Sequence, residues 1–354
     1  MLERFIYPGP HTRVVFGNGT LADLPAEAKR RGMSRVLILC SKGRTQLAEK
    51  IAAALGDACA GICAESVPNM PREVFDAVKA QLAESRADGF VAVGGGSPIG
   101  LAKSVSVSAQ LPFIAVVTTL SGSEMSPKWA LGRGLSRAAG NDPRALPTIA
   151  IYDPQLVLAL PPKVVVASGM NAMAHAVESL YGDDTNPVIQ TLSDDAIARL
   201  YTSLPQVVSS PASIEARNEA LYGAWLAATF RSTTCLHHLI AQQVRQLFDL
   251  DHAQTHAVVL PYALAFNAPS IPDAMARMQK AAGVADMPRA LFELNKTLGL
   301  PLRLTDIGMP EARLEEAADT VMQVKSYNPR PYTRADVITI LKQAISGEAP
   351  KPFV

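Results

Sequence analysis

The sequence predicts an α/β domain with a parallel sheet, followed by a domain built from helices alone. Short apolar runs alternate with helical segments through the first half of the chain, whereas the second half is rich in Ala and Leu and keeps a helical period. Pro154, Pro161 and Pro162 punctuate the change between the two patterns. We therefore expect domains at residues 1–159 and 160–354.

The α/β domain contains three predicted cycles of strand and helix. The run RVLILC at 35–40 is a short buried strand, and TQLAEKIAAAL follows it with helical spacing. A strand near 60–66, the helical PREVFDAVKAQLAE and the apolar GFVAVG ending at Gly94 form the second cycle. A helix from about Pro98 and a strand at 112–119 form the third. Such alternation predicts a parallel sheet covered on both faces.

The second domain is predicted from segments that repeat apolar residues with the period of a helix. These segments are 168–182, 188–209, 212–230, 235–249, 253–267, 273–283, 287–298, 310–324 and 333–346. Hardly a strand pattern lies among them, and no internal repeat is convincing. The period therefore predicts an all-helical domain.

Composition favours small-molecule chemistry. A chain of 354 residues with 48% hydrophobic positions can bury a large core. Its net charge of +1 provides no basic field for nucleic acid or anionic lipid, so neither partner is expected. The four cysteines lack CxxC spacing, no signal-peptide pattern is seen, and no apolar run reaches the roughly 20 residues of a membrane span. We expect a cytoplasmic protein.

A glycine turn separates the strand GFVAVG from the helix that follows. Gly94, Gly95, Gly96 and Ser97 would let the backbone approach a phosphate at the positive end of that helix, and Pro98 suits its first turn. The alternative is a tight turn without a ligand. Its position at the carboxyl end of a parallel strand favours the phosphate interpretation, although the turn is neither GxGxxG nor a Walker loop.

The segments GGGSPIGLAK, PFIAVVTTLSGSEMSP, SGMNAMAHAVESLYG, DHAQTHAVVLPYALAFNAP and YNPRP resemble the maleylacetate reductases, in this order along the chain. These enzymes belong to the iron-containing alcohol dehydrogenase superfamily, which has the fold of dehydroquinate synthase. The resemblance runs from about residue 5 to about residue 345. It implies NAD(P)H-dependent reduction of maleylacetate to 3-oxoadipate in the catabolism of aromatic compounds, commonly by a homodimer.

The resemblance also implies the cofactor site. The GGGS turn would hold the pyrophosphate, while Thr118, Thr119 and Ser123 would line the nucleotide site and Lys103 would help to bind the cofactor. Cys40 and Ser41, at the end of a strand, would help to choose between NADH and NADPH, because an acid there would bind the ribose 2′-hydroxyl.

The residues after this strand read Cys40-Ser41-Lys42-Gly43-Arg44 and include no acid. Their composition slightly favours tolerance of the 2′-phosphate of NADPH. The alternative is that Lys42 and Arg44 are only solvated.

The metal site of the superfamily is altered in this chain. Metal-dependent members use an Asp and a His four residues apart, then two later histidines, and the resemblance maps these positions to Asn171, His175, Gln242 and His252. Amide oxygens are weak ligands for Fe²⁺ or Zn²⁺, so we expect no metal. An Asn at the first position is characteristic of the maleylacetate reductases.

The catalytic residues expected from the resemblance are His175, His237 and His252, with Asn171 positioning groups beside them. Hydride transfer to an electron-poor C=C leaves charge on an enolate oxygen, which without a metal needs a donor such as a protonated His or a Lys. A general acid then supplies a proton to carbon. His237 and His238 point about 100° apart on a helix, so only one of them is expected to face the site.

The substrate is a dicarboxylate and therefore requires cationic anchors, for which Lys128 and Arg330 are candidates. Gln242, Arg245 and Tyr327 depart from the family pattern and are expected to shape the substrate pocket. These departures keep two enzyme alternatives open: a specialised alcohol dehydrogenase acting on another ring-derived substrate, and a metal-free lyase, cyclase or isomerase without net redox chemistry. A non-catalytic binding protein is the least favoured alternative.

Overall fold

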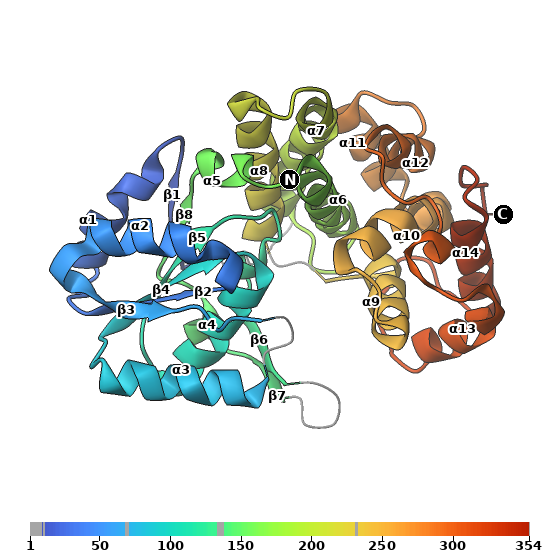
Figure 1. The fold of residues 1–354 in the computed structure, drawn as a ribbon. Helices are drawn as coiled ribbons and strands as arrows, with labels where there is room; N and C mark the ends of the chain where they lie inside the picture. Colours follow the sequence, from blue (N-terminus) through green and yellow to red (C-terminus); the bar gives the residue numbers. More distant parts are fainter. Residues whose placement is uncertain (1–8, 10, 68–70, 133–137, 231–232, 354) are drawn as a thin grey trace. The chain divides into compact units, whose positions relative to one another are not determined.

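The computed structural model describes residues 9, 11–67, 71–132, 138–230 and 233–353. The chain divides into two compact units, one of residues 9–160 and one that includes residues 161–353 (Figure 1). Among the described residues, no helix combines the length and the apolar character that a membrane crossing requires.

The first unit contains a six-stranded sheet among its described residues, in the order β1-β8-β5-β4-β2-β3, and every neighbouring pair is parallel. Its strands are β1 (Arg13–Phe16), β2 (Val36–Cys40), β3 (Cys59–Cys63), β4 (Gly89–Gly94), β5 (Phe113–Val117) and β8 (Ile149–Tyr152). Its α-helices are α1 (Leu24–Arg30), α2 (Thr45–Leu55), α3 (Arg72–Glu84), α4 (Gly96–Ala109) and α5 (Pro154–Leu158). The predicted parallel sheet is confirmed.

Helices cover both faces of this sheet, with α1 and α2 on one side and α3 and α4 on the other (Figure 1). Val91 and Val93 of β4 contact the first side, where they form one apolar cluster with Ala28 of α1 and Ile51 of α2. Because alternate residues of a strand point to opposite faces, burial on both sides explains why β2, β4 and β5 are continuous apolar runs.

The strand register brings the segments that follow β2, β4 and β5 to one edge of the sheet. Cys40 pairs with Val93, and Gly94 pairs with Val117, so the three strands end at nearly the same level. In parallel sheets, ligands bind at the carboxyl ends of the strands. The fold therefore gathers the glycine turn and its neighbours at this edge.

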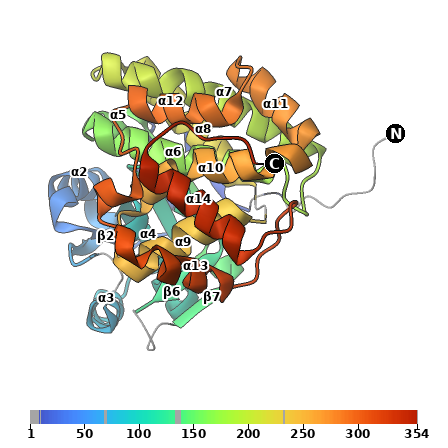
Figure 2. The same cartoon turned by 90° about the vertical axis from the view of Figure 1, so that its right-hand side faces the viewer.

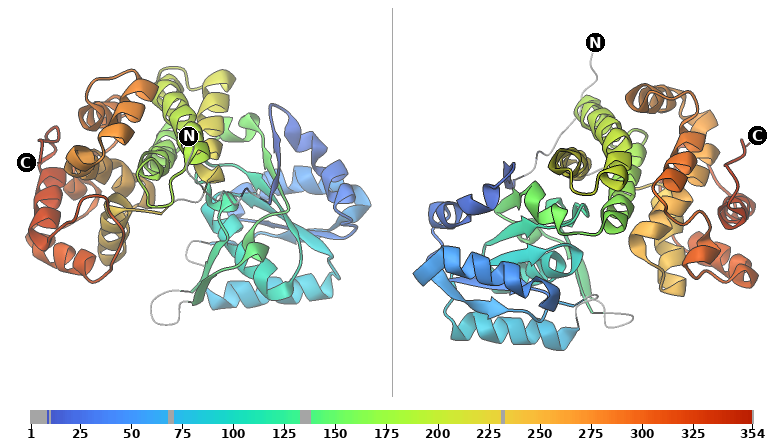
Figure 3. Two further views of the ribbon diagram at one scale, coloured as in Figure 1. Left: turned by 180° about the vertical axis from the view of Figure 1, so that it is seen from behind. Right: turned by 45° about the horizontal axis from the view of Figure 1, so that its top comes forward.

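The described residues of the second unit form helices and contribute no strand. The helices are α6 (Pro162–Ser179), α7 (Pro187–Ser209), α8 (Ile214–Thr229), α9 (Leu236–Phe248), α10 (His252–Asn267), α11 (Pro272–Ala282), α12 (Met287–Thr297), α13 (Leu314–Met322) and α14 (Arg334–Ser346). The α10 helix packs against α6, α9, α12 and α14, and α13 packs against α9 and α14 (Figure 2). Figure 3 shows this part, coloured from green to red, from two further sides.

The structure adds strands that the sequence interpretation did not include. β1 and β8 extend one side of the sheet, and β6 (Lys128–Leu131) pairs with β7 (Ala138–Asn141) as an antiparallel hairpin. These strands have only four residues each, which is too short for a hydrophobic period to stand out. The helix expected over 310–324 is shorter, because a 3₁₀ turn at Glu311–Arg313 precedes α13.

The contact between α6 and α7 yields a stability prediction. A Cβ atom added at Gly169 would lie 2.5 Å from Cδ2 of the buried Leu204. We expect Gly169→Ala to lower the free energy of unfolding by about 1–3 kcal/mol, because the core must shift to admit the methyl group. Urea denaturation measures the change.

A double-mutant cycle with Leu204→Ala provides the control. Removing the leucine side chain leaves space for the new methyl group. In this background, Gly169→Ala should therefore lower the free energy of unfolding much less. An equal loss of unfolding free energy in both backgrounds would contradict the contact between position 169 and Leu204.

Candidate active site

The glycine turn between β4 and α4 is packed tightly on its inner side. Gly94 has a φ of 147°, which favours glycine, and a Cβ there would lie 2.7 Å from the Pro98 ring. A Cβ at Gly95 would lie 2.5 Å from Oγ1 of Thr119, whereas one at Gly96 would meet nothing within 4 Å. The turn is therefore closed against the protein and open at the first residue of α4, where backbone N–H groups can bind a phosphate.

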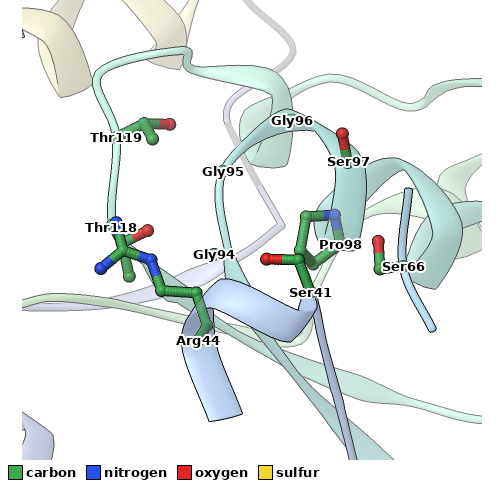
Figure 4. Close-up of a pocket in the computed structure, with 10 residues that line it drawn as sticks. All are labelled: Ser41, Arg44, Ser66, Gly94, Gly95, Gly96, Ser97, Pro98, Thr118 and Thr119. Atoms are coloured by element: carbon green, nitrogen blue, oxygen red, sulfur yellow. The ribbon is translucent and has the colours of Figure 1, made fainter. Parts of the chain in front are cut away.

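A pocket of about 370 Å³ lies around this turn (Figure 4). It is lined by Ser41, Arg44, Ser66, Gly94, Gly95, Gly96, Ser97, Pro98, Thr118 and Thr119. The side-chain hydroxyls of Ser66, Thr118 and Thr119 are buried and have no hydrogen-bond partner among the described residues. A buried hydroxyl without a partner costs free energy, so these groups fit a polar ligand that supplies the missing partners.

Three of the residues predicted to bind the cofactor are not among those that line this pocket. Cys40 is buried in β2, and neither Lys103 nor Ser123 lines the pocket. Nζ of Lys103 instead donates a hydrogen bond to the carbonyl of Ser123 at 2.8 Å. The adjacent Glu124 is buried and accepts a hydrogen bond from the Tyr152 hydroxyl at 2.6 Å, and burial raises the pKa of Glu124. Lys103 and Ser123 therefore help to hold the loop after β5.

In the helical unit, α6 carries three polar residues on one side. Asn171, His175 and Glu178 follow at i, i+4 and i+7, positions that share a face of a helix. Asn171 and Glu178 are buried, while His175 remains partly exposed. The side-chain oxygen of Asn171 has no hydrogen-bond partner within the described chain.

The Glu178 carboxylate caps the N-terminus of α9. Oε2 accepts a hydrogen bond from the N–H of Cys235 at 2.9 Å, and Oε1 accepts one from the N–H of His238 at 3.3 Å. The positive end of a helix favours a carboxylate at this position. Burial raises the pKa of Glu178, while the His237 imidazole and the two N–H groups oppose the rise.

His238 joins Glu178 to His175. Its Nδ1 atom lies 2.5 Å from Oε2 of Glu178, and its Nε2 atom lies 3.3 Å from Nε2 of His175. A chain of contacts thus runs from a buried carboxylate to a partly exposed imidazole. The sequence interpretation assigned this position to His237, but Nε2 of His237 contacts the carbonyl of His256 at 3.0 Å, so the structure favours His238.

Further imidazoles pack around His238. Ring nitrogens of His237, His238 and His256 lie within 4.8 Å of one another, and the His252 ring lies 4.6 Å from that of His256. Burial lowers the pKa of His237 and of His256. Although part of His252 reaches solvent, the protein around it and the Arg245 cation lower its pKa to about 4. For His237, His252 and His256 the surroundings thus favour the uncharged ring.

Arg245 is one of the residues predicted to contact substrate, and it has a hydrogen-bond donor that no described residue accepts. Its Nε atom is buried and has no hydrogen-bond partner among the described residues, and its charge acts on His252. Gln242 is exposed on the same helix. Lys128, at the start of β6, and Tyr327 are also exposed.

Arg330, a predicted substrate anchor, also contacts the end of α10. Its Nη1 atom donates a hydrogen bond to the carbonyl of Phe266 at 2.9 Å, and its guanidinium lies 4.5 Å from the centre of the Phe266 ring. The preceding Asn328 bonds to Asn267 and to the N–H of Leu236. The YNPRP segment thus fastens the end of α10 to the start of α9.

Sequence reasoning missed Glu178 and did not choose His238. One signal could have found Glu178, because it is the single acidic residue of the long α6 helix and lies three residues after His175. An acid in such a buried segment requires a partner. Nothing in the sequence identified that partner, since His237 and His238 are adjacent.

Comparison with known proteins places these features in a family. Residues 10–154 match the family described as iron-containing alcohol dehydrogenase, and residues 165–345 match the C-terminal part of the Fe-containing alcohol dehydrogenase family. The maleylacetate reductase of Sphingobium indicum is 39% identical over 98% of this chain and 99% of its own length.

Solved structures agree with this assignment. A maleylacetate reductase from Agrobacterium tumefaciens, 33% identical, superposes with a TM-score of 0.95 over 99% of this chain and 100% of its own. A putative alcohol dehydrogenase from Ralstonia eutropha, 40% identical, gives the same score and the same coverage. The chain therefore belongs to the iron-containing alcohol dehydrogenase family, within its maleylacetate reductase subgroup, and is an oxidoreductase.

Proposed function

We propose that this oxidoreductase transfers a hydride from NADH or NADPH to the electron-poor C=C of maleylacetate or a closely related oxo-dicarboxylate. Hydride adds to the carbon β to the ketone, and the electron pair moves to the ketone oxygen as an enolate. A proton then adds to the α carbon and restores the ketone, so the reaction consumes one NAD(P)H and one proton. The contact chain Glu178–His238–His175 is the observation that carries this proposal.

The contacts between Glu178, His238 and His175 support a route by which a proton reaches the enolate. His175 is partly exposed and would give its proton to the substrate carbon. His238 can replace that proton through the contact between the two Nε2 atoms, while Glu178 holds the other side of its ring. The carboxylate thus fixes the orientation of His238 and favours positive charge on the pair of imidazoles.

The remaining polar groups suit the charged parts of the substrate. Asn171 is one helical turn before His175, and its neutral amide can donate a hydrogen bond to the enolate oxygen. Arg245, with its unused Nε donor, suits a substrate carboxylate, and Gln242 on the same helix can add a polar contact. Neutral His252 beside Arg245 can contribute an N–H group.

The family name implies iron, but the donor set in this chain does not fit tightly bound iron. Asn171 offers an amide where metal-dependent relatives have a carboxylate, and Gln242 is an exposed amide. The buried carboxylate of Glu178 is already bonded to His238 and to the start of α9. We therefore propose that the reaction proceeds without a resident metal.

In this proposal, one compact unit binds the dinucleotide and the other binds the substrate. The first, predicted as residues 1–159, would bind the dinucleotide, which is supported by the glycine turn and by the unpartnered hydroxyls around its pocket. The second, predicted as residues 160–354, would bind and protonate the substrate. Homodimer assembly and a cytoplasmic location stay predictions.

Substitution of His175 tests the proposed reaction. We expect His175→Gln to lower kcat with maleylacetate by about 100- to 10,000-fold, because the general acid is lost, while nucleotide binding persists. Oxidation of the nicotinamide, followed by absorbance, measures the rate. Gln246→Ala replaces an exposed residue on α9 and serves as the control, because it should leave the rate and the stability unchanged. Substrate conversion without nicotinamide oxidation would instead indicate lyase or isomerase chemistry.

Substitution of Glu178 tests its positioning role. Glu178→Gln keeps the shape of the side chain but removes the charge that favours protonated imidazoles, so the alkaline limb of the kcat/KM profile should move to lower pH by about one unit. We also expect kcat to fall by about 10- to 100-fold. Circular dichroism checks that α9 remains folded. A loss of rate without a shift of the profile would mean that Glu178 has only a structural role.

Elemental analysis tests metal independence. Protein purified without chelator should contain far less than one zinc or iron per chain, because Asn171 and Gln242 put amides at two of the four ligand positions of metal-dependent relatives. Activity should survive dialysis against a chelator. Near-stoichiometric metal together with loss of activity on chelation would overturn the proposal.

A further inference from the structure

The end of β2 lies beside the glycine turn, where a dinucleotide would place its adenosine ribose. Cys40 pairs with Val93, so Ser41 follows at the level of Gly94. Ser41 and Arg44 line the same pocket as the glycine turn (Figure 4). In nucleotide folds of this kind, the residues after the strand next to the glycine turn contact the ribose hydroxyls or the 2′-phosphate.

This part of the pocket lacks the acid that would favour NADH. The residues that line it among the described part of the chain include no Asp or Glu. The nearest acid along the sheet, Glu65, pairs with Ser41 through the backbone, but its side chain is exposed and does not line the pocket. The ribose 2′-hydroxyl of NADH therefore finds no carboxylate acceptor there.

Arg44 contributes a positive charge to the pocket. It ends the 3₁₀ turn η2 (Lys42–Arg44), and its backbone N–H bonds to the carbonyl of Ser41 at 2.8 Å. The residue is half-buried, lines the pocket, and makes no ion pair with any other described residue. Lys42, two residues earlier, is exposed and does not line the pocket. The structure thus separates two basic residues that the sequence could not distinguish.

We propose that Arg44 binds the 2′-phosphate of NADPH and makes the protein select NADPH over NADH. A guanidinium matches a phosphate with two parallel charge-assisted hydrogen bonds, and Ser41 is small enough to admit the phosphate. The proposal rests on the proposed dinucleotide-dependent reductase function and names which dinucleotide that function uses.

Equilibrium binding of NADPH and NADH to the full-length protein, followed by nicotinamide fluorescence, tests the proposal. The two cofactors differ only in the 2′-phosphate. NADPH should bind at least about 10-fold more tightly, and Arg44→Ala should weaken NADPH binding by about 10- to 100-fold while NADH binding changes little. Arg44→Lys should recover part of the loss, because the charge remains but the paired hydrogen bonds do not.

Two further variants make the test specific. Lys42→Ala removes the same charge from an exposed neighbour and should change the binding of either cofactor by less than about 5-fold. Ser41→Asp adds an acid after β2, so it should favour NADH and oppose NADPH. Equal effects of Arg44→Ala on both cofactors, or equal losses in the Lys42 and Arg44 variants, would overturn the proposal.

The binding readout separates this inference from the proposed reaction. Selective NADPH binding that depends on Arg44, without reduction of maleylacetate, would contradict only the substrate assignment. Reduction of maleylacetate with equal use of both cofactors, unchanged by Arg44→Ala, would contradict only the role of Arg44.

Discussion

The hydrogen bonds between Glu178 and the first turn of α9 are the interaction on which the reactive part of the helical unit depends. A buried carboxylate is costly unless every oxygen has a partner, and its loss of hydration amounts to several kcal/mol. Here two backbone N–H groups and the His238 ring supply those partners. Because the same carboxylate orients the ring, the register between α6 and α9 and the position of the imidazole are set together.

The pocket around the glycine turn is organised by backbone geometry instead of buried charge. Three parallel strands end at one level, and glycines at 94 and 95 let the chain turn against Pro98 and Thr119 without side-chain overlap. The hydroxyls that line the pocket are neutral, so burying them costs less free energy than burying an unpaired ion would. In the proposed nucleotide complex, a phosphate would meet N–H groups that are already aligned.

Much of the fold could be predicted because hydrophobic periodicity reports burial directly. The helices from α6 to α12 match their expected segments to within a few residues, apart from an earlier start of α6, and the buried runs of β2, β4 and β5 stand out. Four-residue strands such as β1 do not stand out in the sequence, because their pairing is decided by neighbours that are distant along the chain.

The site was less predictable for a related reason. The sequence identified His175 from its motif, yet the choice between His237 and His238 depends on which ring meets a residue about sixty positions away. The bond from Arg330 to the Phe266 carbonyl could not be predicted either, since no motif reveals a backbone partner. Residue type suggests chemistry, whereas tertiary contacts decide whether a group is available for it.

Different turns of the α9 helix make different contacts. Its first turn holds His238 against Glu178, whereas Gln242 and Arg245, one and two turns later, contribute nothing to that contact. If the later turns contact substrate as proposed, substitutions there would change substrate binding without touching the contact between His238 and Glu178. Under the proposed function, substrate choice and proton supply would therefore depend on different turns of one helix.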